Sequence, residues 1–185
     1  MDNAKILEDL ISSAIGAKVH FEVWWAQRSE AKPKPLSAVY KHSEFFLISQ
    51  DAHYIAFFVY LAHLFDGRKD SSSIPTYLAN AKDRYEISHL HRLQLTYLAL
   101  AQRAEPLILA RHKAVAHVDA SLSQDDIFGP MSMTWKDVRV IIYEATTLVS
   151  ELAGARDPAS IGIPHDRRLI EVTLKLINAL ENSEV

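Results

Sequence analysis

The sequence predicts an all-α fold, a single-domain helical bundle of five to six helices. Apolar residues recur at helical spacing in every long segment, and strand patterns are weak throughout. The five glycines supply no hairpin turn, since the one Asp-Gly pair, Asp66-Gly67, ends a helical run. A chain of 185 residues can bury a sizeable core, so we expect one domain over residues 1–185.

Three helices are expected before the middle of the chain. The first spans about residues 3–31, and the prolines at 33 and 35 break it because proline disfavours helical geometry in the preceding residue. A second helix, about residues 36–65, carries apolar residues all round and should lie centrally in the bundle or at a subunit interface. Pro75 opens a short third helix that runs to about Lys82. The buried stripe of the first helix is expected to comprise Leu7, Leu10, Ile11, Ala14, Phe21 and Trp25.

Three further helical segments follow. One begins near Ser88, and Pro106 should kink or break it near Ala104 before the helix resumes over residues 107–117. Thr134 and Asp137 resemble a capping box, with Asp in place of the usual Glu or Gln. The helix that they open ends at Gly154, and its apolar stripe comprises Val138, Ile141, Ile142, Ala145, Leu148, Val149 and Leu152. A last helix begins near His165, with these residues expected to face inward: Leu169, Val172, Leu176, Ile177 and Leu180.

Composition excludes several classes of protein. The net charge is −3, so no global basic footprint points to a nucleic-acid binder, although residues 82–117 hold six basic residues against three acidic ones. The absence of cysteine excludes disulfides, thiolate metal sites and a cysteine nucleophile. The polar start is not a signal peptide, and no apolar run approaches the roughly 20 residues that span a bilayer. We therefore expect a cytoplasmic protein that does not enter a membrane.

Residues 109–119, Leu-Ala-Arg-His-Lys-Ala-Val-Ala-His-Val-Asp, hold the strongest chemical pattern. Arg111 has a planar, permanently charged guanidinium group that suits phosphate binding. A histidine such as His117 can take up or release a proton near neutral pH. Six residues along a helix separate two side chains by roughly 120° and about 9 Å. A joint site therefore needs the reach of Arg111, an unwound helix end or a symmetry-related chain. A phosphate clamp beside a proton-transfer group is the minimum for metal-independent RNA cleavage through the 2′-hydroxyl. An Arg and a His near a helix end also serve as surface or capping residues.

The pattern Arg111-His112-Lys113 followed by Ala116-His117-Val118-Asp119 resembles the Arg…His motif of HEPN domains, and most closely their abortive-infection, AbiU-type branch. The resemblance implies an all-helical, metal-independent endoribonuclease without a cofactor, with RNA as substrate. It assigns catalysis to Arg111, which would hold the phosphate, and to His117, which would transfer a proton or stabilise the transition state. His112, Lys113 and Asp119 would bind the phosphate or orient the site. It also implies a homodimer with two motifs at one cleft, and an antitoxin or other regulatory protein.

One departure from the family pattern matters. HEPN toxins paired with a nucleotidyltransferase commonly continue His-x-Tyr, and that tyrosine is modified, whereas Asp119 stands there in this chain. Modification by that route is therefore in doubt, and Asp119 either orients a histidine or caps the helix end. Some HEPN domains are non-catalytic dimerisation or nucleotide- or RNA-binding modules, which is the alternative function. A helix-turn-helix DNA binder fits less well because the basic residues are scattered.

The other histidines support no metal site. A di-iron bundle needs two Glu-x-x-His motifs, and this chain has one, ending at His89. His89 and His91 are two residues apart and do not share a helix face. His53 and His63 lie on an apolar helix, where hydrogen-bonded core or rim residues are the more common case.

Overall fold

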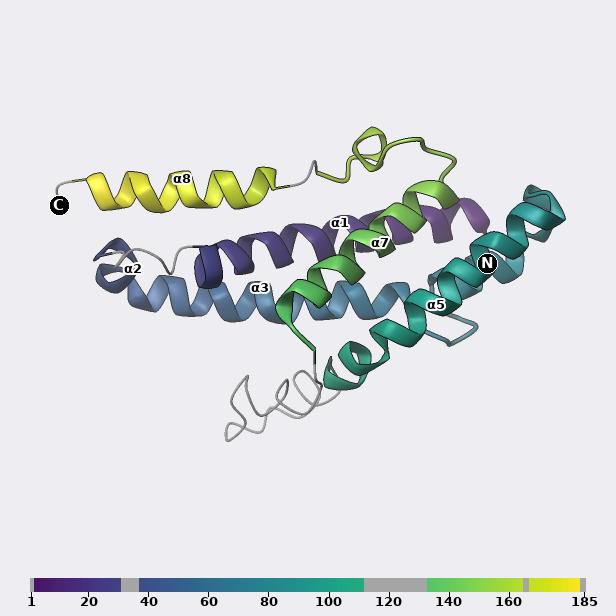
Figure 1. Ribbon diagram of the computed structural model, residues 1–185, viewed down its shortest axis with the longest axis horizontal. Helices are drawn as coiled ribbons and strands as arrows, with labels where there is room; N and C mark the ends of the chain where they lie inside the picture. Colours follow the sequence, from purple (N-terminus) through teal and green to yellow (C-terminus); the bar gives the residue numbers. More distant parts are fainter. Residues whose placement is uncertain (1, 31–36, 112–132, 165–166, 184–185) are drawn as a thin grey trace.

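The computed structural model describes residues 2–30, 37–111, 133–164 and 167–183. Over these ranges it contains seven α-helices and no strand, which confirms the all-α class. Helices α1 (Asn3–Trp25) and α3 (Ser43–Leu64) lie side by side and antiparallel (Figure 1). Helices α5 (Ile87–Arg111) and α7 (Trp135–Leu152) pack on each other and on this pair, and the short α4 (Ile74–Asn80) leads from one pair to the other. Helix α8 (Arg168–Asn182) runs beside α1 and α2 (Ser37–Lys41).

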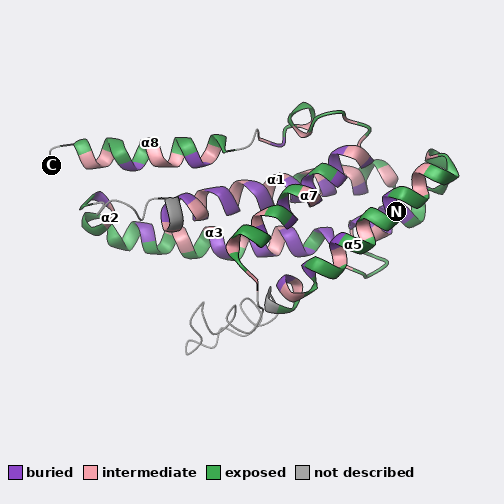
Figure 2. Ribbon diagram, in the orientation of Figure 1, coloured by how far each residue is buried: buried purple, intermediate pink, exposed green. Residues whose placement is uncertain are grey.

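The core is built where α1, α3 and α7 meet, and buried residues follow α1 along most of its length (Figure 2). Trp24 is 1 % exposed, with its ring centroid 4.4 Å from that of Trp135 and 5.7 Å from those of Tyr54 and Phe57. The predicted stripe of α1 is right for Leu10, Ala14 and Phe21, while Leu7, Ile11 and Trp25 are only partly buried. Trp24 takes the buried place because it follows Phe21 by three residues, on the face that points at α3 and α7.

Helices α1 and α3 approach each other closely at Gly16. A Cβ atom at this position would lie 2.5 Å from Cγ of Tyr60, inside van der Waals contact. The Tyr60 ring in turn stacks on His20, with centroids 5.6 Å apart and planes 14° from parallel. A glycine is therefore needed here for space, since its backbone is ordinary helix.

Two expected helices begin and end differently from the predictions. The first ends as α1 at Trp25 and continues as a π-helical segment, η1 (Ala26–Glu30). The second is divided at His42 into α2 and α3. A contact from α8 marks the beginning of α2, where Glu181 accepts hydrogen bonds from the backbone N–H groups of Ser37 (2.9 Å) and Ala38 (2.6 Å). Glu181 thus caps the start of α2. The Ser37 hydroxyl also donates to Glu181, and this hydrogen bond keeps the pKa of the Glu181 carboxyl low.

Helix α3 is buried on one side only, so it is not central in the bundle, and its place at a subunit interface stays a prediction. Its inner residues Phe57, Phe58 and Leu61 are at most 1 % exposed, but Phe45, Leu47 and Ile48 are more than half exposed.

The expectation that no apolar run could span a bilayer also needs correction. By length and composition α3 qualifies, with a mean hydropathy of 1.3 over an 18-residue window of which 33 % is buried. Core helices of water-soluble bundles pass the same test.

The last two differences concern α5 and α8. Helix α5 runs without a break from Ile87 through Pro106 to Arg111, although proline cannot donate the backbone hydrogen bond at that position. Ala104 and Leu107, both at most 1 % exposed, hold the helix on the core on either side of Pro106. In α8, Ile170 and Ile177 are buried, whereas Val172 and Leu176 are more than half exposed. Leu169, Leu174 and Leu180 are partly buried, so the helix touches its neighbours along a narrow strip.

Candidate functional site

The structure places Arg111 at the last residue of α5. His112, Lys113, His117 and Asp119 lie outside the described residues, so the arrangement of the Arg…His pair stays a prediction. What the structure does show is the scaffold on both sides of the motif. The segment 112–132 joins the end of α5 to the beginning of α7.

The end of α5 is fixed by its buried face. Leu93, Leu100, Ala104 and Leu107 recur every three to seven residues along α5 and are at most 3 % exposed. Leu107 precedes Arg111 by four residues, about one helical turn. The turn that ends at Arg111 therefore starts from a side chain locked in the core.

Two ion pairs join α5 to α7. Arg103 Nη1 donates to Glu144 Oε2 over 2.5 Å, and Arg92 donates to Glu151. The hydrogen bond from Arg92 holds the pKa of the Glu151 carboxyl below its usual range, and His89 Nε2 lies 3.5 Å from the same carboxylate. Exposed ion pairs of this kind add little to the free energy of unfolding. Two of them along one interface nevertheless favour one alignment of the antiparallel helices α5 and α7 along their axes. They also engage, within the protein, two of the six basic residues between positions 82 and 117.

The beginning of α7 is fixed by the predicted capping box. The Thr134 hydroxyl accepts from the Asp137 N–H over 3.2 Å, and Asp137 Oδ2 accepts from the Thr134 N–H over 2.8 Å. The Thr134 hydroxyl also donates to Asp137 Oδ2 over 2.7 Å. This hydrogen bond and the one from the Thr134 N–H lower the pKa of Asp137, because both favour the charged carboxylate. Trp135 packs its ring on Trp24 directly after the cap. The helix end that precedes residues 112–132 in the chain and the helix end that follows them are thus both fixed by contacts with the rest of the protein.

Three histidines of the described residues, His20, His53 and His63, lie away from the motif in settings that the structure defines. His20 Nδ1 and His53 Nδ1 are 2.7 Å apart, so one nitrogen donates and the other accepts, which confirms His53 as a hydrogen-bonded rim residue. Burial lowers the pKa of both rings, and in His53 the charge of His20 adds to the effect. His63 is exposed and lines a polar surface pocket of about 390 Å³. Within the described residues no three His, Asp or Glu side chains come together as a metal site.

The sequence analysis missed one pair of charged residues. Lys18 and Glu22 on α1 form a hydrogen-bonded ion pair of 2.7 Å, and their side chains are only 7 % and 3 % exposed. Each directly follows a buried residue, Ala17 or Phe21, and this position together with their spacing of four residues is the signal that could have pointed to them.

Comparison with protein families gives one match. The family model described as HEPN_AbiU2 (AbiU2) matches residues 4–161. The match covers the four long helices α1, α3, α5 and α7 together with the segment that carries Arg111 and His117, and it ends before α8. Searches among curated proteins and among solved structures found no match.

Proposed function

Because the chain belongs to the AbiU2 family of HEPN abortive-infection domains, we propose that it is a metal-independent endoribonuclease acting in phage defence or in a toxin–antitoxin-like system. The observation that carries the proposal is the Arg111…His117 pattern within the matched residues. A ribonuclease of this kind would act on RNA in the cytoplasm.

The proposed reaction is transfer of the phosphodiester to the neighbouring 2′-hydroxyl. The 2′-oxygen attacks phosphorus and loses its proton, the bond from phosphorus to the 5′-oxygen breaks, and the 5′-oxygen gains a proton. His117 takes part in the proton transfer or stabilises the transition state. Arg111 holds the phosphate and stabilises the charge that develops on its oxygens, with Lys113 beside it. The products are a 2′,3′-cyclic phosphate and a 5′-hydroxyl.

His112 and Asp119 are proposed to orient the site. His112 directly follows Arg111 in the chain, and Asp119 follows His117 by two residues. A carboxylate that accepts a hydrogen bond from an imidazole fixes its tautomer and its direction. Asp119 could equally cap the end of the helix, and the conservative change Asp119→Asn separates the two roles, since it keeps a cap but weakens a charged hydrogen bond to a histidine.

A homodimer completes the proposal. Six residues along an ideal helix separate two side chains by roughly 120°, so two chains facing each other would assemble a fuller site from Arg111 and His117 than one chain. The exposed apolar residues of α3, Phe45, Leu47 and Ile48, offer a surface of the kind that subunit contacts cover. A regulatory or antitoxin protein is proposed as a further partner, because an unrestrained ribonuclease would damage its own cell.

The test is incubation of the purified chain with a mixed pool of transfer and messenger RNA in excess EDTA. The wild type should cleave RNA, while His117→Ala and Arg111→Ala should lose cleavage and keep their helical circular dichroism. His91→Ala is the matched control, since His91 is an exposed histidine on α5, five turns before the motif. Cleavage that depends on a divalent metal, or that survives in either motif variant, would contradict the proposal.

The second candidate function is a non-catalytic HEPN module that dimerises or binds nucleotides or RNA. It predicts retained RNA in a gel-shift assay without cleavage, for the wild type and for His117→Ala alike. The intact Arg111 and His117 favour the enzyme, because a binding module has no need of a proton-transfer group.

A further inference from the structure

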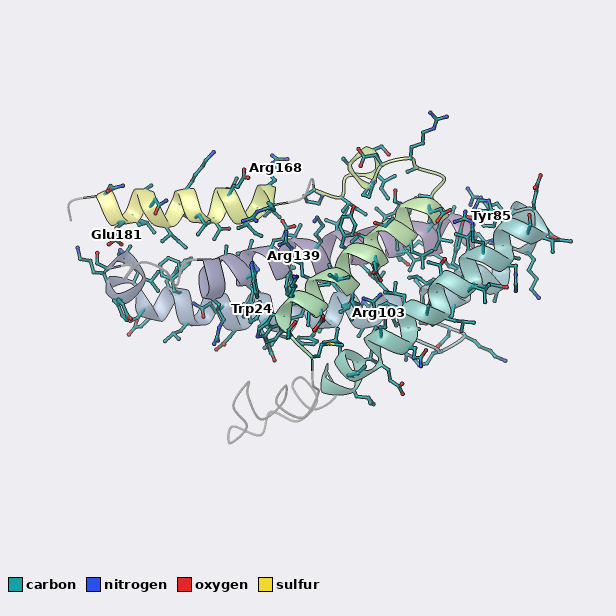
Figure 3. All side chains as sticks on the ribbon, in the orientation of Figure 1. Trp24, Tyr85, Arg103, Arg139, Arg168 and Glu181 are labelled. Carbon is teal, nitrogen blue, oxygen red and sulfur yellow. The ribbon has the colours of Figure 1, made fainter. Side chains whose placement is uncertain are left out.

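The polar pocket of about 390 Å³ lies where the first half of α1, the last turn of α3 and the loop after α3 meet. Helix α1 lines it with Asp9, Ser12 and Ser13, whose spacing places them on one face of the helix. Residues between 66 and 72 line the opposite wall. Figure 3 labels Trp24 toward the other end of α1, and about 16 Å of helix separates it from Ser13. The pocket is therefore separate from the aromatic core.

The lining of this pocket consists of polar side chains throughout. Four of the lining residues are serines, and the others are two aspartates, one histidine and one arginine. Most small-molecule sites are lined mainly by apolar and aromatic side chains, which hold the flat or aliphatic part of a ligand. A ligand of this pocket would instead be held by hydrogen bonds.

The charged side chains of the pocket are paired within the protein. Asp9 Oδ1 accepts from Lys5 Nζ over 2.9 Å, and Asp66 Oδ2 accepts from Arg68 Nη2 over 2.9 Å. The Ser72 hydroxyl donates to Asp9 Oδ2 over 2.7 Å, and this hydrogen bond lowers the pKa of the Asp9 carboxyl. Two carboxylates and two cations leave no excess charge, so the pocket favours neither an anion nor a cation.

The wall formed by α1 carries a hydroxyl group without a partner. Ser13 is only 7 % exposed, and its hydroxyl forms no hydrogen bond within the described part of the chain. Because Ser13 borders the pocket, a ligand can reach this hydroxyl. A nearly buried hydroxyl without a partner is costly, so a ligand that exchanges hydrogen bonds with it is favoured. Ser12 and His63 are exposed at the same pocket and supply further donors and acceptors.

We propose that this pocket binds a neutral polyhydroxy ligand of the size of a monosaccharide or a cyclitol. Each ligand hydroxyl donates one hydrogen bond and accepts others, which matches a lining that mixes serines with carboxylates. A carboxylate has about four acceptor sites, and Asp9 uses two of them, so it can also accept from two neighbouring ring hydroxyls. The pocket uses none of the motif residues, so this proposal is independent of RNA cleavage.

The binding test is a saturation-transfer NMR titration of the full chain with D-glucose, D-galactose and myo-inositol. At least one of these neutral compounds should bind with millimolar affinity. Three matched compounds each change one feature: D-glucuronate adds a negative charge, D-glucosamine adds a positive charge, and cyclohexanol keeps a six-membered ring with a single hydroxyl. Each should bind more weakly than the best neutral compound. An absence of binding by all three neutral compounds at tens of millimolar would overturn the proposal, as would equal or tighter binding of any matched compound.

Variants locate the site. Ser12→Trp fills the pocket from an exposed position on α1 and should abolish binding. Thr147→Trp is the matched control, because Thr147 is exposed on α7 and does not line the pocket.

Ser13→Ala removes only the unpartnered hydroxyl. It should weaken binding about fivefold, the equivalent of one hydrogen bond. Its unfolding free energy in urea should be unchanged or higher, because the lost hydroxyl had no partner and alanine is the better helix former. Unchanged affinity in Ser13→Ala or in a folded Ser12→Trp would place any binding elsewhere and refute the site.

Discussion

Adding one methyl group at Gly16 should destabilise the bundle, although alanine is the better helix former. In α1 the change Gly16→Ala alone would gain about 1 kcal/mol from helix propensity. The new Cβ would lie 2.5, 2.6 and 2.7 Å from the Cγ, Cδ2 and Cδ1 atoms of Tyr60. These atoms are at the base of the ring and cannot move without shifting χ1 or the two helices. Overpacking typically costs about 1–3 kcal/mol, and three such contacts suggest the upper end, for a net loss of about 2 kcal/mol.

The assay is urea unfolding followed by helical circular dichroism, with all variants at one protein concentration because a dimer would make stability concentration-dependent. In a Tyr60→Ala background the obstacle is gone, so Gly16→Ala should then stabilise by about 1 kcal/mol. Gly67→Ala is the matched control, since nothing lies within 4 Å of a Cβ there, and it should change stability by less than about 0.5 kcal/mol. A Gly16→Ala variant as stable as the wild type would refute the close approach of α1 and α3.

Three other predictions concern the scaffold of the motif and the histidine pair. Leu107→Ala should cost about 2–5 kcal/mol in urea unfolding because Leu107 is 1 % exposed, whereas Leu109→Ala, at 57 % exposure, should cost less than about 1 kcal/mol. Thr134→Ala removes the cap of α7 and should lower the unfolding free energy by about 1 kcal/mol, seen as a lower melting temperature. Because the pKa values of His20 and His53 are lowered in the folded state, the unfolded chain binds more protons below about pH 6.5. The stability from this pair is present above that pH and is lost as the pH falls, so the midpoint of urea unfolding should drop on acidification, and less so in His53→Gln. A steeper drop in that variant would contradict the assignment.

Local patterns predicted most of the fold. The apolar stripe of residues 138–152 and the Thr134…Asp137 cap depend only on residues within a few turns of one helix, and both are present as expected. The errors arose where a distant element decides. Pro106 does not break α5 because the core holds Ala104 and Leu107. Val172 and Leu176 are exposed because α8 has few neighbours, which its own sequence does not encode.

In the candidate site, too, the local sequence predicts some features while others depend on the packing of distant elements. Residue types and spacing predict the chemistry of residues 109–119, and the family match to residues 4–161 includes them, while the roles of Arg111 and His117 stay predictions. The Lys18–Glu22 pair escaped notice because a lysine and a glutamate four residues apart usually lie on a solvated face. Their burial depends on the packing of other helices against α1, which the local pattern does not encode.

The most direct test of the central claim uses a synthetic RNA with a mapped cleavage site, incubated with the protein in excess EDTA. A single 2′-deoxy nucleotide replaces the residue on the 5′ side of the scissile phosphate. If Arg111 and His117 promote attack by the 2′-hydroxyl, cleavage at that phosphate should disappear while other sites are still cut, and the wild-type product should end in a 2′,3′-cyclic phosphate. Cleavage of the deoxy-substituted RNA at the same phosphate, with a 3′-hydroxyl end, would show that water is the nucleophile and would contradict the account.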